Sequence, residues 1–296
     1  MNRQEAADKW YDTIFQLYGA DEFKEKVRRL RVFQHNKVKY SASGIRIPNY
    51  FWIARRGGGI STCINAFAEY LYAENIIEFN GIVKYFEFKL GYMGPGDFFS
   101  ELTRLHNTIS EIAGHHRYFK GLACIHIDEW QDHINEDNFY KVLDYLAIKN
   151  DTVKTIFCID SDDNRVIEKI ESSISSRLRI ERVTFRFPEI CELVSFIETK
   201  YFQRQGFSLT EDARGLLGES IGAISTGKNF NGFVTVKHLA KDVLYHLLMS
   251  EVKSRSISAD MLGSFAKDSA HINKLKSFVG TKSVIGFSSG AEEYSR

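Results

Sequence analysis

Three consecutive glycines, residues 57–59, follow an apolar stretch and precede an apolar helical pattern. The segment IARRGGGIST (53–62) therefore has the order strand, glycine loop, helix, which is also the order of the phosphate-binding loop G-x-x-x-x-G-K-[ST]. Backbone amides of such a loop cradle phosphates, and the following helix N-terminus favours an anion. Ile60 occupies the lysine slot and Ala54 the slot of the first glycine. The segment is either a degenerate phosphate loop or a glycine turn.

Two acids, Asp128 and Glu129, end a second apolar stretch, ACIHIDEW (123–130). In open α/β sheets, ligands bind at the carboxyl ends of the strands. In a nucleotide hydrolase the first acid would hold magnesium and the second would polarise the attacking water. Ser61 or Thr62 could contact the same magnesium or a phosphate. The alternative for the acidic pair is a strand end followed by a helix cap.

The elements that must position these residues alternate between strand and helix up to residue 187. An amphipathic helical pattern runs from Glu5 to Phe33 with a break at 18–21, and we expect Asp21 to cap its second half. Beyond this region, strand patterns fall at 50–54, 81–90, 121–130, 153–160 and 181–187, and helical patterns at 61–74, 97–117, 138–148 and, as helix or turn, 162–178. This alternation predicts an α/β fold with a mainly parallel sheet.

After Pro188 the sequence shows helical patterns only, which predicts a small all-helical lid domain. Pro188 lacks a backbone donor and disfavours helix in the residue before it, so we place a boundary there. The predicted organisation is a helical lead-in (1–48), a large α/β domain (49–187), a small helical domain (188–258) and a C-terminal tail (259–296).

Composition excludes several classes of protein. The chain has 296 residues and a net charge of +1, so no strong field indicates a nucleic-acid or membrane partner. No apolar run reaches the roughly 20 residues of a membrane span, and the N-terminus lacks the apolar core of a signal peptide. The four cysteines lie far apart without a CxxC pair, so we expect reduced core thiols in a cytoplasmic protein: Cys63, Cys124, Cys158 and Cys191.

Several segments, taken in order, resemble a branch of the AAA+ ATPases: the red-type Rubisco activase, the sporulation stage V protein K and the type VII secretion ATPase. LYGADEFKEKVRRL resembles the opening segment of that branch, and WIARRGGGISTCI stands at its phosphate loop. CIHIDEW resembles its strand ending in two acids, SSRLRIERVTFRFP its arginine-finger region, and VIGF its closing segment. The resemblance implies a P-loop NTPase-like αβα sandwich followed by a helical lid, in a ring-forming, chaperone-like protein such as a hexamer.

The resemblance also assigns roles to individual residues. The phosphate loop would contain Gly57, Gly58, Gly59 and Ile60, with Ser61 and Thr62 at its metal and phosphate end. Asp128 would be the magnesium acid and Glu129 the water-activating acid. Arg177, in SSRL, would be an arginine finger offered to the neighbouring subunit, and Tyr92, in GYMG, a central-pore residue that grips a peptide. The simpler alternatives are a surface arginine and a tyrosine packed in a loop.

Three positions depart from that pattern. Ile60 replaces the phosphate-binding lysine, Phe233 replaces the polar sensor of the small domain, and Asp160 stands where a neutral sensor is usual. An aspartate there would repel a γ-phosphate.

The leading hypothesis from the sequence is therefore a pseudo-ATPase subunit that regulates or scaffolds a protein-remodelling ring, alone or with an active AAA+ relative, and for which ATP, ADP and Mg²⁺ are doubtful ligands. Alternatives are an active ATPase in which Arg55 or Arg56 replaces the lysine, and an interaction module that binds no nucleotide.

Overall fold

The computed structural model describes residues 2–41, 46–77, 85–89, 100, 103–107, 121–127, 136–227, 229–249 and 254–267. The chain divides into two compact units, Met1–Pro188 and Glu189–Arg296. In the described ranges, no helix is both long enough and apolar enough to cross a bilayer.

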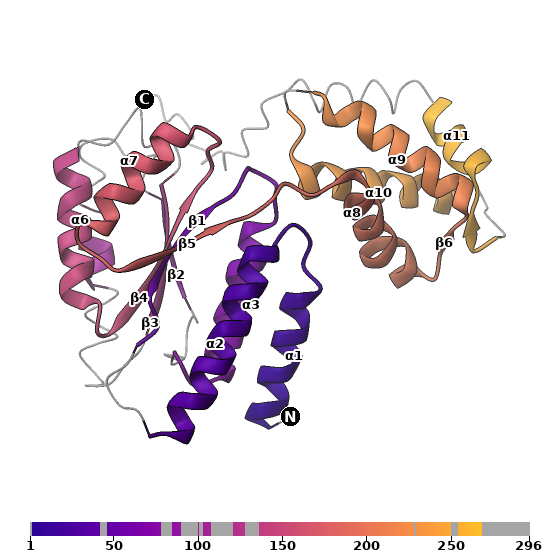
Figure 1. Cartoon of the computed structure of the whole chain (residues 1–296). Coiled ribbons are helices and arrows are strands. Elements are labelled where there is room, and N and C mark those ends of the chain that lie inside the picture. Colours follow the sequence, from indigo (N-terminus) through magenta and orange to yellow (C-terminus); the bar gives the residue numbers. More distant parts are fainter. Residues whose placement is uncertain are drawn as a thin grey trace, which may run out of the picture. The chain divides into compact units, whose positions relative to one another are not determined.

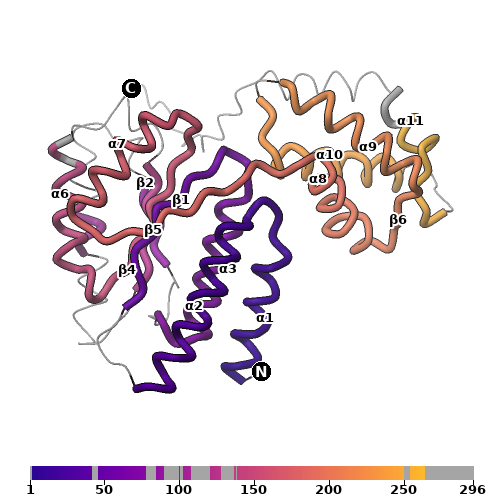
Figure 2. The backbone as a smooth tube through the Cα atoms, in the orientation of Figure 1, coloured from indigo at the N-terminus to yellow at the C-terminus, as the bar shows by residue number. Residues whose placement is uncertain are grey.

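The first unit is built on a five-stranded sheet in which every described strand pair is parallel. The strand order is β2-β3-β4-β1-β5, so the first strand lies between the last two. Figure 2 shows this sheet nearly edge-on, between α2 and α3 on one side and α6 and α7 on the other. The strands are β1 (Asn49–Ile53), β2 (Phe86–Lys89), β3 (Gly121–His126), β4 (Val153–Ile159) and β5 (Ile180–Thr184). The predicted α/β class with a parallel sheet is confirmed.

Helices cover both faces of this sheet (Figure 1). One face carries α1 (Arg3–Phe15), α2 (Asp21–Lys39) and α3 (Ile60–Ala73), and the other carries α6 (Glu136–Lys149) and α7 (Asn164–Ser175). All five residues of β1 are buried, as expected for a central strand with helices on both sides. Its side chains alternate between two apolar clusters, with Tyr50 and Trp52 in one and Phe51 and Ile53 in the other.

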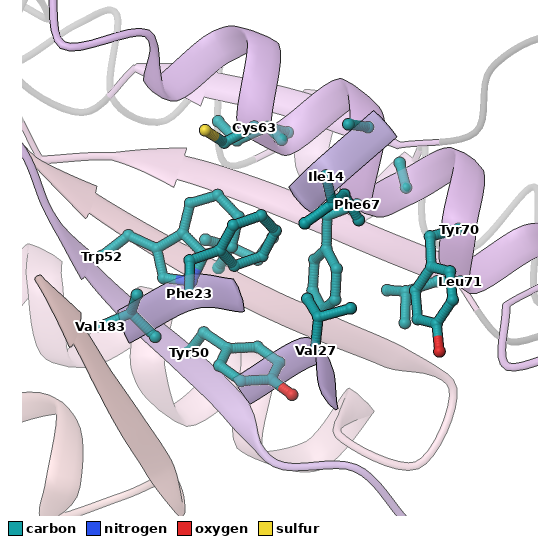
Figure 3. Packing of buried hydrophobic residues seen from close by; sticks show 14 of the residues in the cluster. Ile14, Phe23, Val27, Tyr50, Trp52, Cys63, Phe67, Tyr70, Leu71 and Val183 are labelled. Carbon is teal, nitrogen blue, oxygen red and sulfur yellow. The ribbon is translucent and has the colours of Figure 1, made fainter. Parts of the chain in front are cut away.

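The cluster on the α1–α3 face is rich in aromatic side chains (Figure 3). Phe23 of α2 packs against Trp52 and Phe67 with ring centroids 5.0 and 5.4 Å apart, both edge to face. Ile14 of α1 and Val27 of α2 belong to the same cluster. The N-terminal helices are therefore part of the core of the first unit, because their apolar faces cover one side of its sheet.

A buried amide connects β1 to both of its neighbours. The Asn49 side chain accepts a hydrogen bond from the Thr155 backbone amide at 2.9 Å and donates to the Arg179 carbonyl at 3.2 Å and to the Asn150 side chain at 3.0 Å. A buried amide must satisfy its donors and acceptor, and these partners exist only in one register of three strands. Asn49 therefore helps to fix the position of β1.

Several predicted boundaries differ in the structure. The helical break is confirmed, but Asp21 is the first residue of α2 and provides no cap; the preceding residue is the buried Ala20. The Asp21 carboxylate instead forms two ion pairs: Oδ1 lies 3.7 Å from Lys24 Nζ, and Oδ2 lies 3.6 Å from Arg186 Nη2. Helix α2 continues to Lys39, beyond the predicted Phe33, and its last turn contains Lys37 and Lys39, whose positive charges favour a helix C-terminus.

The second unit is mainly helical, but the expectation of helices only is wrong. Two short strands pair in parallel, with Leu209 opposite Ile257, and both of these side chains are buried in the core of the unit. The elements are α8 (Ile190–Ile197), a π turn (Glu198–Phe202), a 3₁₀ turn (Gln203–Gln205), β6 (Ser208–Leu209), α9 (Glu211–Ser225), α10 (Gly232–Met249), β7 (Ser256–Ile257) and α11 (Ala259–Lys267). Two-residue strands are too short to give a periodic signal in the sequence.

Candidate phosphate-loop site

The glycine loop follows the central strand of the sheet and leads into α3. The Ala54 amide still pairs with the Ile159 carbonyl of β4 at 3.0 Å, so the loop begins directly at the sheet edge. Gly57 and Gly59 have φ angles of +80° and +87°. Residues with a Cβ rarely adopt these left-handed backbone conformations. The predicted order of strand, glycine loop and helix is confirmed, and two of its three glycines are required by the backbone.

The N-terminus of α3 is the part of the loop suited to an anion. Gly59 is its cap residue, and within the described residues no side chain caps it. The amides of Thr62 and Cys63 bond back to the Gly59 carbonyl at 3.0 and 3.1 Å, which closes the first turn. The side chains of Ser61 and Thr62 are exposed at this end. The backbone therefore retains the helix-terminus feature that favours negative charge.

Ile60 occupies the lysine slot and faces the interior. Its side chain is half-buried and packs against the apolar cluster of the α1–α3 face. This position therefore supplies an apolar contact to the core, and no charge to the loop.

Asp160 directly follows β4, the strand beside β1. Its carboxylate oxygen Oδ1 accepts a hydrogen bond from the backbone amide of Arg56 at 2.8 Å. A negatively charged side chain of the protein, that of Asp160, is therefore hydrogen-bonded to the loop backbone. A phosphate approaching the loop would meet this negative charge at short range.

The two arginines before the glycines have different surroundings. The Arg55 guanidinium lies over the Phe187 ring, 5.2 Å from its centroid, and its Nε is 4.0 Å from a carboxylate oxygen of Asp162. Both contacts involve the Arg55 side chain, which therefore already has partners beside the loop. The Arg56 side chain is exposed, and its backbone amide makes the hydrogen bond with Asp160. Of the two arginines, Arg56 is thus the better candidate to replace a lysine.

Arg177 follows α7 and is paired within its own unit. Its Nε donates to Asp144 Oδ1 at 2.7 Å, and its guanidinium lies 5.2 Å from the centroid of the Tyr140 ring. Both partners are on α6. The side chain is 41% exposed, so it is accessible from outside this unit.

Phe233 belongs to α10 in the second unit. Its ring packs edge to face on Phe196 of α8, with centroids 4.8 Å apart, and it borders the apolar core there. The residue at the expected sensor position therefore stabilises helix packing within its own unit.

Asp128, Glu129 and Tyr92 lie outside the described residues, so their roles stay predictions. Ile127, directly before the acids, is buried at the end of β3, and its amide bonds to the Cys158 carbonyl at 2.7 Å.

The cysteine prediction needs correction. Cys63, Cys124 and Cys158 are buried free thiols, but Cys191 is exposed, since it lies in the first turn of α8 outside the apolar stripe of that helix. Cys124 and Cys158 are 34 residues apart in the sequence, yet their sulfur atoms are 3.5 Å apart on neighbouring strands. His126 Nε2 is 3.6 Å from Cys124 Sγ.

Sequence reasoning missed this cluster because it searched for cysteine spacing along the chain. The available signal was C-x-H on one strand with a cysteine at the end of the next strand. Contacts within the cluster favour the thiolate form of Cys124 and the protonated form of His126. The Cys158 and His126 contacts lower the pKa of the Cys124 thiol against the effect of burial. Burial opposes charge on His126, but Cys124 and Glu87 outweigh it and raise its pKa.

The described residues fit an anion at the α3 N-terminus but do not fit an intact site for ATP hydrolysis. Gly57, Gly59 and Ser61 are compatible with phosphate binding. Ile60 supplies no cation, and the Asp160 carboxylate is already bonded to the loop. The described loop thus combines a backbone compatible with an anion, an apolar residue at position 60 and a carboxylate bonded to its backbone.

No family model matches the chain, and no curated protein matches it in sequence. Among solved structures, RuvB from Thermotoga maritima is 15% identical over 86% of this chain and 72% of its own, with a TM-score of 0.49. PCH-2 from C. elegans is 11% identical over 91% and 70%, with a TM-score of 0.48. A chain of the Drosophila ORC structure bound to DNA and Cdc6 is 9% identical over 82% and 41%, with a TM-score of 0.46. These values do not assign the chain to a family.

Proposed function

We propose that this chain is a degenerate AAA+ subunit that regulates or scaffolds a protein-remodelling ring and hydrolyses ATP weakly or not at all. The observation that carries the proposal is the hydrogen bond from the Arg56 amide to the Asp160 carboxylate, next to an isoleucine in the lysine slot. The loop keeps its backbone form, but the groups that would attract the terminal phosphates are replaced by an apolar contact and a negative charge.

The expected effect on affinity is large. A hydrogen bond to a charged group contributes roughly 1.5–3 kcal/mol, so losing the lysine alone lowers affinity by about 10–100-fold. The Asp160 carboxylate adds repulsion. The catalytic loss is greater than the binding loss, because a cation at this position stabilises charge that develops in the transition state.

The AAA+ part of the proposal rests on the ordered resemblance of the sequence segments together with the fold. β1 lies inside the parallel sheet and delivers its loop to the N-terminus of α3, and a mainly helical unit follows Pro188. In this proposal Asp128 and Glu129 line the same sheet edge, Arg177 faces the next subunit, and Tyr92 reaches a central pore. The partners are a protein substrate or an active AAA+ relative in a homo- or hetero-oligomeric ring.

The bond to Asp160 also favours a second candidate, an interaction module on this fold that binds no nucleotide. An active ATPase is less well supported, because Arg55 is engaged by Phe187 and Asp162. Of the two arginines, Arg56 then remains as a replacement for the lysine.

Two measurements on the full chain separate these candidates. Calorimetric titration with ATP and with ADP tests binding: weak binding supports the degenerate ATPase, and no binding up to millimolar nucleotide supports the interaction module. Steady-state hydrolysis tests activity. A turnover number in the usual enzyme range of about 1–10³ s⁻¹ would refute the proposal. Light-scattering mass, alone and with an active AAA+ relative, tests ring formation, and a mass of one subunit in every mixture would exclude the ring.

A further inference from the structure

Four side chains with metal-binding atoms meet on one face of the sheet, away from the glycine loop's own residues. Cys124 and His126 are two residues apart on β3, so they point to the same face. His126 is opposite Cys158 of β4, and Cys124 is opposite Glu87 of β2. Cys124 and Cys158 belong to the apolar cluster that α1–α3 cover. Three neighbouring strands therefore bring these four side chains together.

The potential ligand atoms are close to one another. Cys124 Sγ lies 3.5 Å from Cys158 Sγ and 3.6 Å from His126 Nε2. His126 Nε2 lies 3.0 Å from Glu87 Oε1. The two sulfur atoms and a ring nitrogen of His126 all lie within 4.8 Å of one another.

These separations match the edges of a zinc tetrahedron. Zn–S bonds of about 2.3 Å and Zn–N bonds of about 2.0–2.1 Å place two sulfur ligands about 3.8 Å apart and a sulfur and a nitrogen about 3.6 Å apart. The measured distances of 3.5 and 3.6 Å differ from these values by a few tenths of an ångström. The two sulfur atoms and the imidazole nitrogen could thus bind an ion with small side-chain movements, and Glu87 would move from its contact with His126 Nε2 to reach the ion.

We propose that Cys124, Cys158, His126 and Glu87 form a binding site for a zinc ion. Thiolate and imidazole ligands select zinc and similar soft or borderline ions over magnesium and calcium, which prefer oxygen. Two thiolates balance the charge of Zn²⁺ in the apolar core, and the carboxylate of Glu87 adds one negative charge at the half-exposed end of the site. Without a metal, the two sulfur atoms make weak thiol hydrogen bonds in a buried region, while His126 Nε2 pairs with Glu87 Oε1 at 3.0 Å.

Glu87 completes the site and gives it an entry path. Its side chain is 44% exposed, whereas that of His126 is 11% exposed. An ion can therefore arrive from solvent at the carboxylate and pass to the buried ligands. Glu87 then supplies the fourth, oxygen ligand. This site is separate from the magnesium position expected near Ser61, and it does not depend on nucleotide binding.

The test is metal titration of the full chain after removal of metals with a chelator and under a thiol reductant. We expect one Zn²⁺ per chain and, with Co²⁺ as a spectroscopic probe, a thiolate-to-cobalt charge-transfer band with the intense visible bands of tetrahedral coordination. Zn²⁺ should also raise the thermal midpoint of the chain. Absence of the charge-transfer band, or a stoichiometry near zero, would overturn the proposal.

Variants locate the ligands. Cys124→Ser and Cys158→Ser should each abolish the charge-transfer band, whereas Cys63→Ser, a buried cysteine outside the cluster, and the exposed Cys191→Ser should keep it. Glu87→Gln should weaken Zn²⁺ affinity by about 10–100-fold, and an unchanged affinity would refute its role as a ligand. Circular dichroism checks folding, so a folded Cys124→Ser chain that still binds one Zn²⁺ would refute the site even if the other variants were unstable.

Discussion

The Asp160 carboxylate and the Arg56 backbone amide lie 2.8 Å apart, so the segment after β4 is bonded to the loop after β1. One aspartate thus contributes both a hydrogen bond and a negative charge to the loop. These two contributions can be separated, because asparagine keeps the acceptor oxygen and loses the charge.

Asp160→Asn should raise the affinity for ATP by about 10–100-fold if the loop binds phosphate, because it removes one close repulsive charge. Titration calorimetry measures the change. Asp162→Asn is the matched control, since its side chain is 81% exposed and lies 4.0 Å from Arg55. Equal affinities of the two variants would show that the Asp160 charge does not face the ligand.

Ile60→Lys should raise ATP affinity further, and more strongly in the Asp160→Asn background. In the wild-type background the new lysine can pair with Asp160, so the increase in ATP affinity should be smaller. Its aliphatic stem can replace the half-buried apolar contact of Ile60 while the ammonium group reaches solvent. Ile60→Met is the control for packing. The prediction fails if the Lys and Met variants bind ATP equally in both backgrounds.

Arg177→Ala should change the free energy of unfolding by less than about 1 kcal/mol, because Arg177 and Asp144 form a surface ion pair. In a mixed ring with an active relative, the same change should lower the partner's hydrolysis rate, by up to the 10³–10⁵-fold range known for arginine fingers. Arg182→Ala is a close control, since Arg182 is also 41% exposed and pairs with Glu171 at 3.2 Å. Equal hydrolysis rates with either variant would identify Arg177 as a surface residue.

Lys154 gives a prediction about pH. Burial, followed by the charge of Arg46, lowers its pKa to about 8, with Asp151 acting in the opposite direction. The unfolded lysine keeps its proton up to about pH 10.4, so between pH 8 and that value the unfolded chain binds more protons and the native state gains stability as pH rises. Below pH 8 the full cost of the buried charge is present.

The measurement is the free energy of unfolding of wild type and Lys154→Met at pH 7 and pH 9.5. Relative to wild type, Lys154→Met should gain the most free energy of unfolding at pH 7, and this gain should be smaller at pH 9.5. Lys169→Met, at an exposed position of α7, should show no such change with pH. A constant difference between Lys154→Met and wild type across this range would contradict the lowered pKa.

The fold was largely predictable because the relevant signals are local. The apolar run at 50–54, the glycines that follow and the helical period of α3 are each visible in neighbouring residues, and alternation of such segments indicates a parallel sheet. The contact between Asp160 and Arg56 was not predictable, although Asp160 departs from the family pattern and Arg56 is a possible substitute for the lysine. It depends on β1 and β4 being neighbours, which no local pattern specifies.

The same limit applies to the cysteine cluster and to Asn49. Cys124 and Cys158 read as isolated apolar residues in two separate strands, and only the register of β3 against β4 brings their sulfur atoms together. Asn49 reads as a polar residue at a strand end, yet it is buried. Its hydrogen-bond partners are Thr155 of β4, Asn150 before β4 and Arg179 directly before β5.

The position of β1 between β4 and β5 has a consequence for synthesis of the chain. Tyr50 pairs with Ile156 and Ile53 with Thr184, so the two partners of β1 leave the ribosome more than a hundred residues after it. At about 5–20 residues per second, the segment NYFWI waits roughly 5–20 s for its first partner, β4. Contacts of such long range form slowly and expose the strand to aggregation in the meantime. The glycine loop follows this strand and bonds to Ile159 and Asp160 at the end of β4, so it cannot make these contacts before β4 has been synthesised.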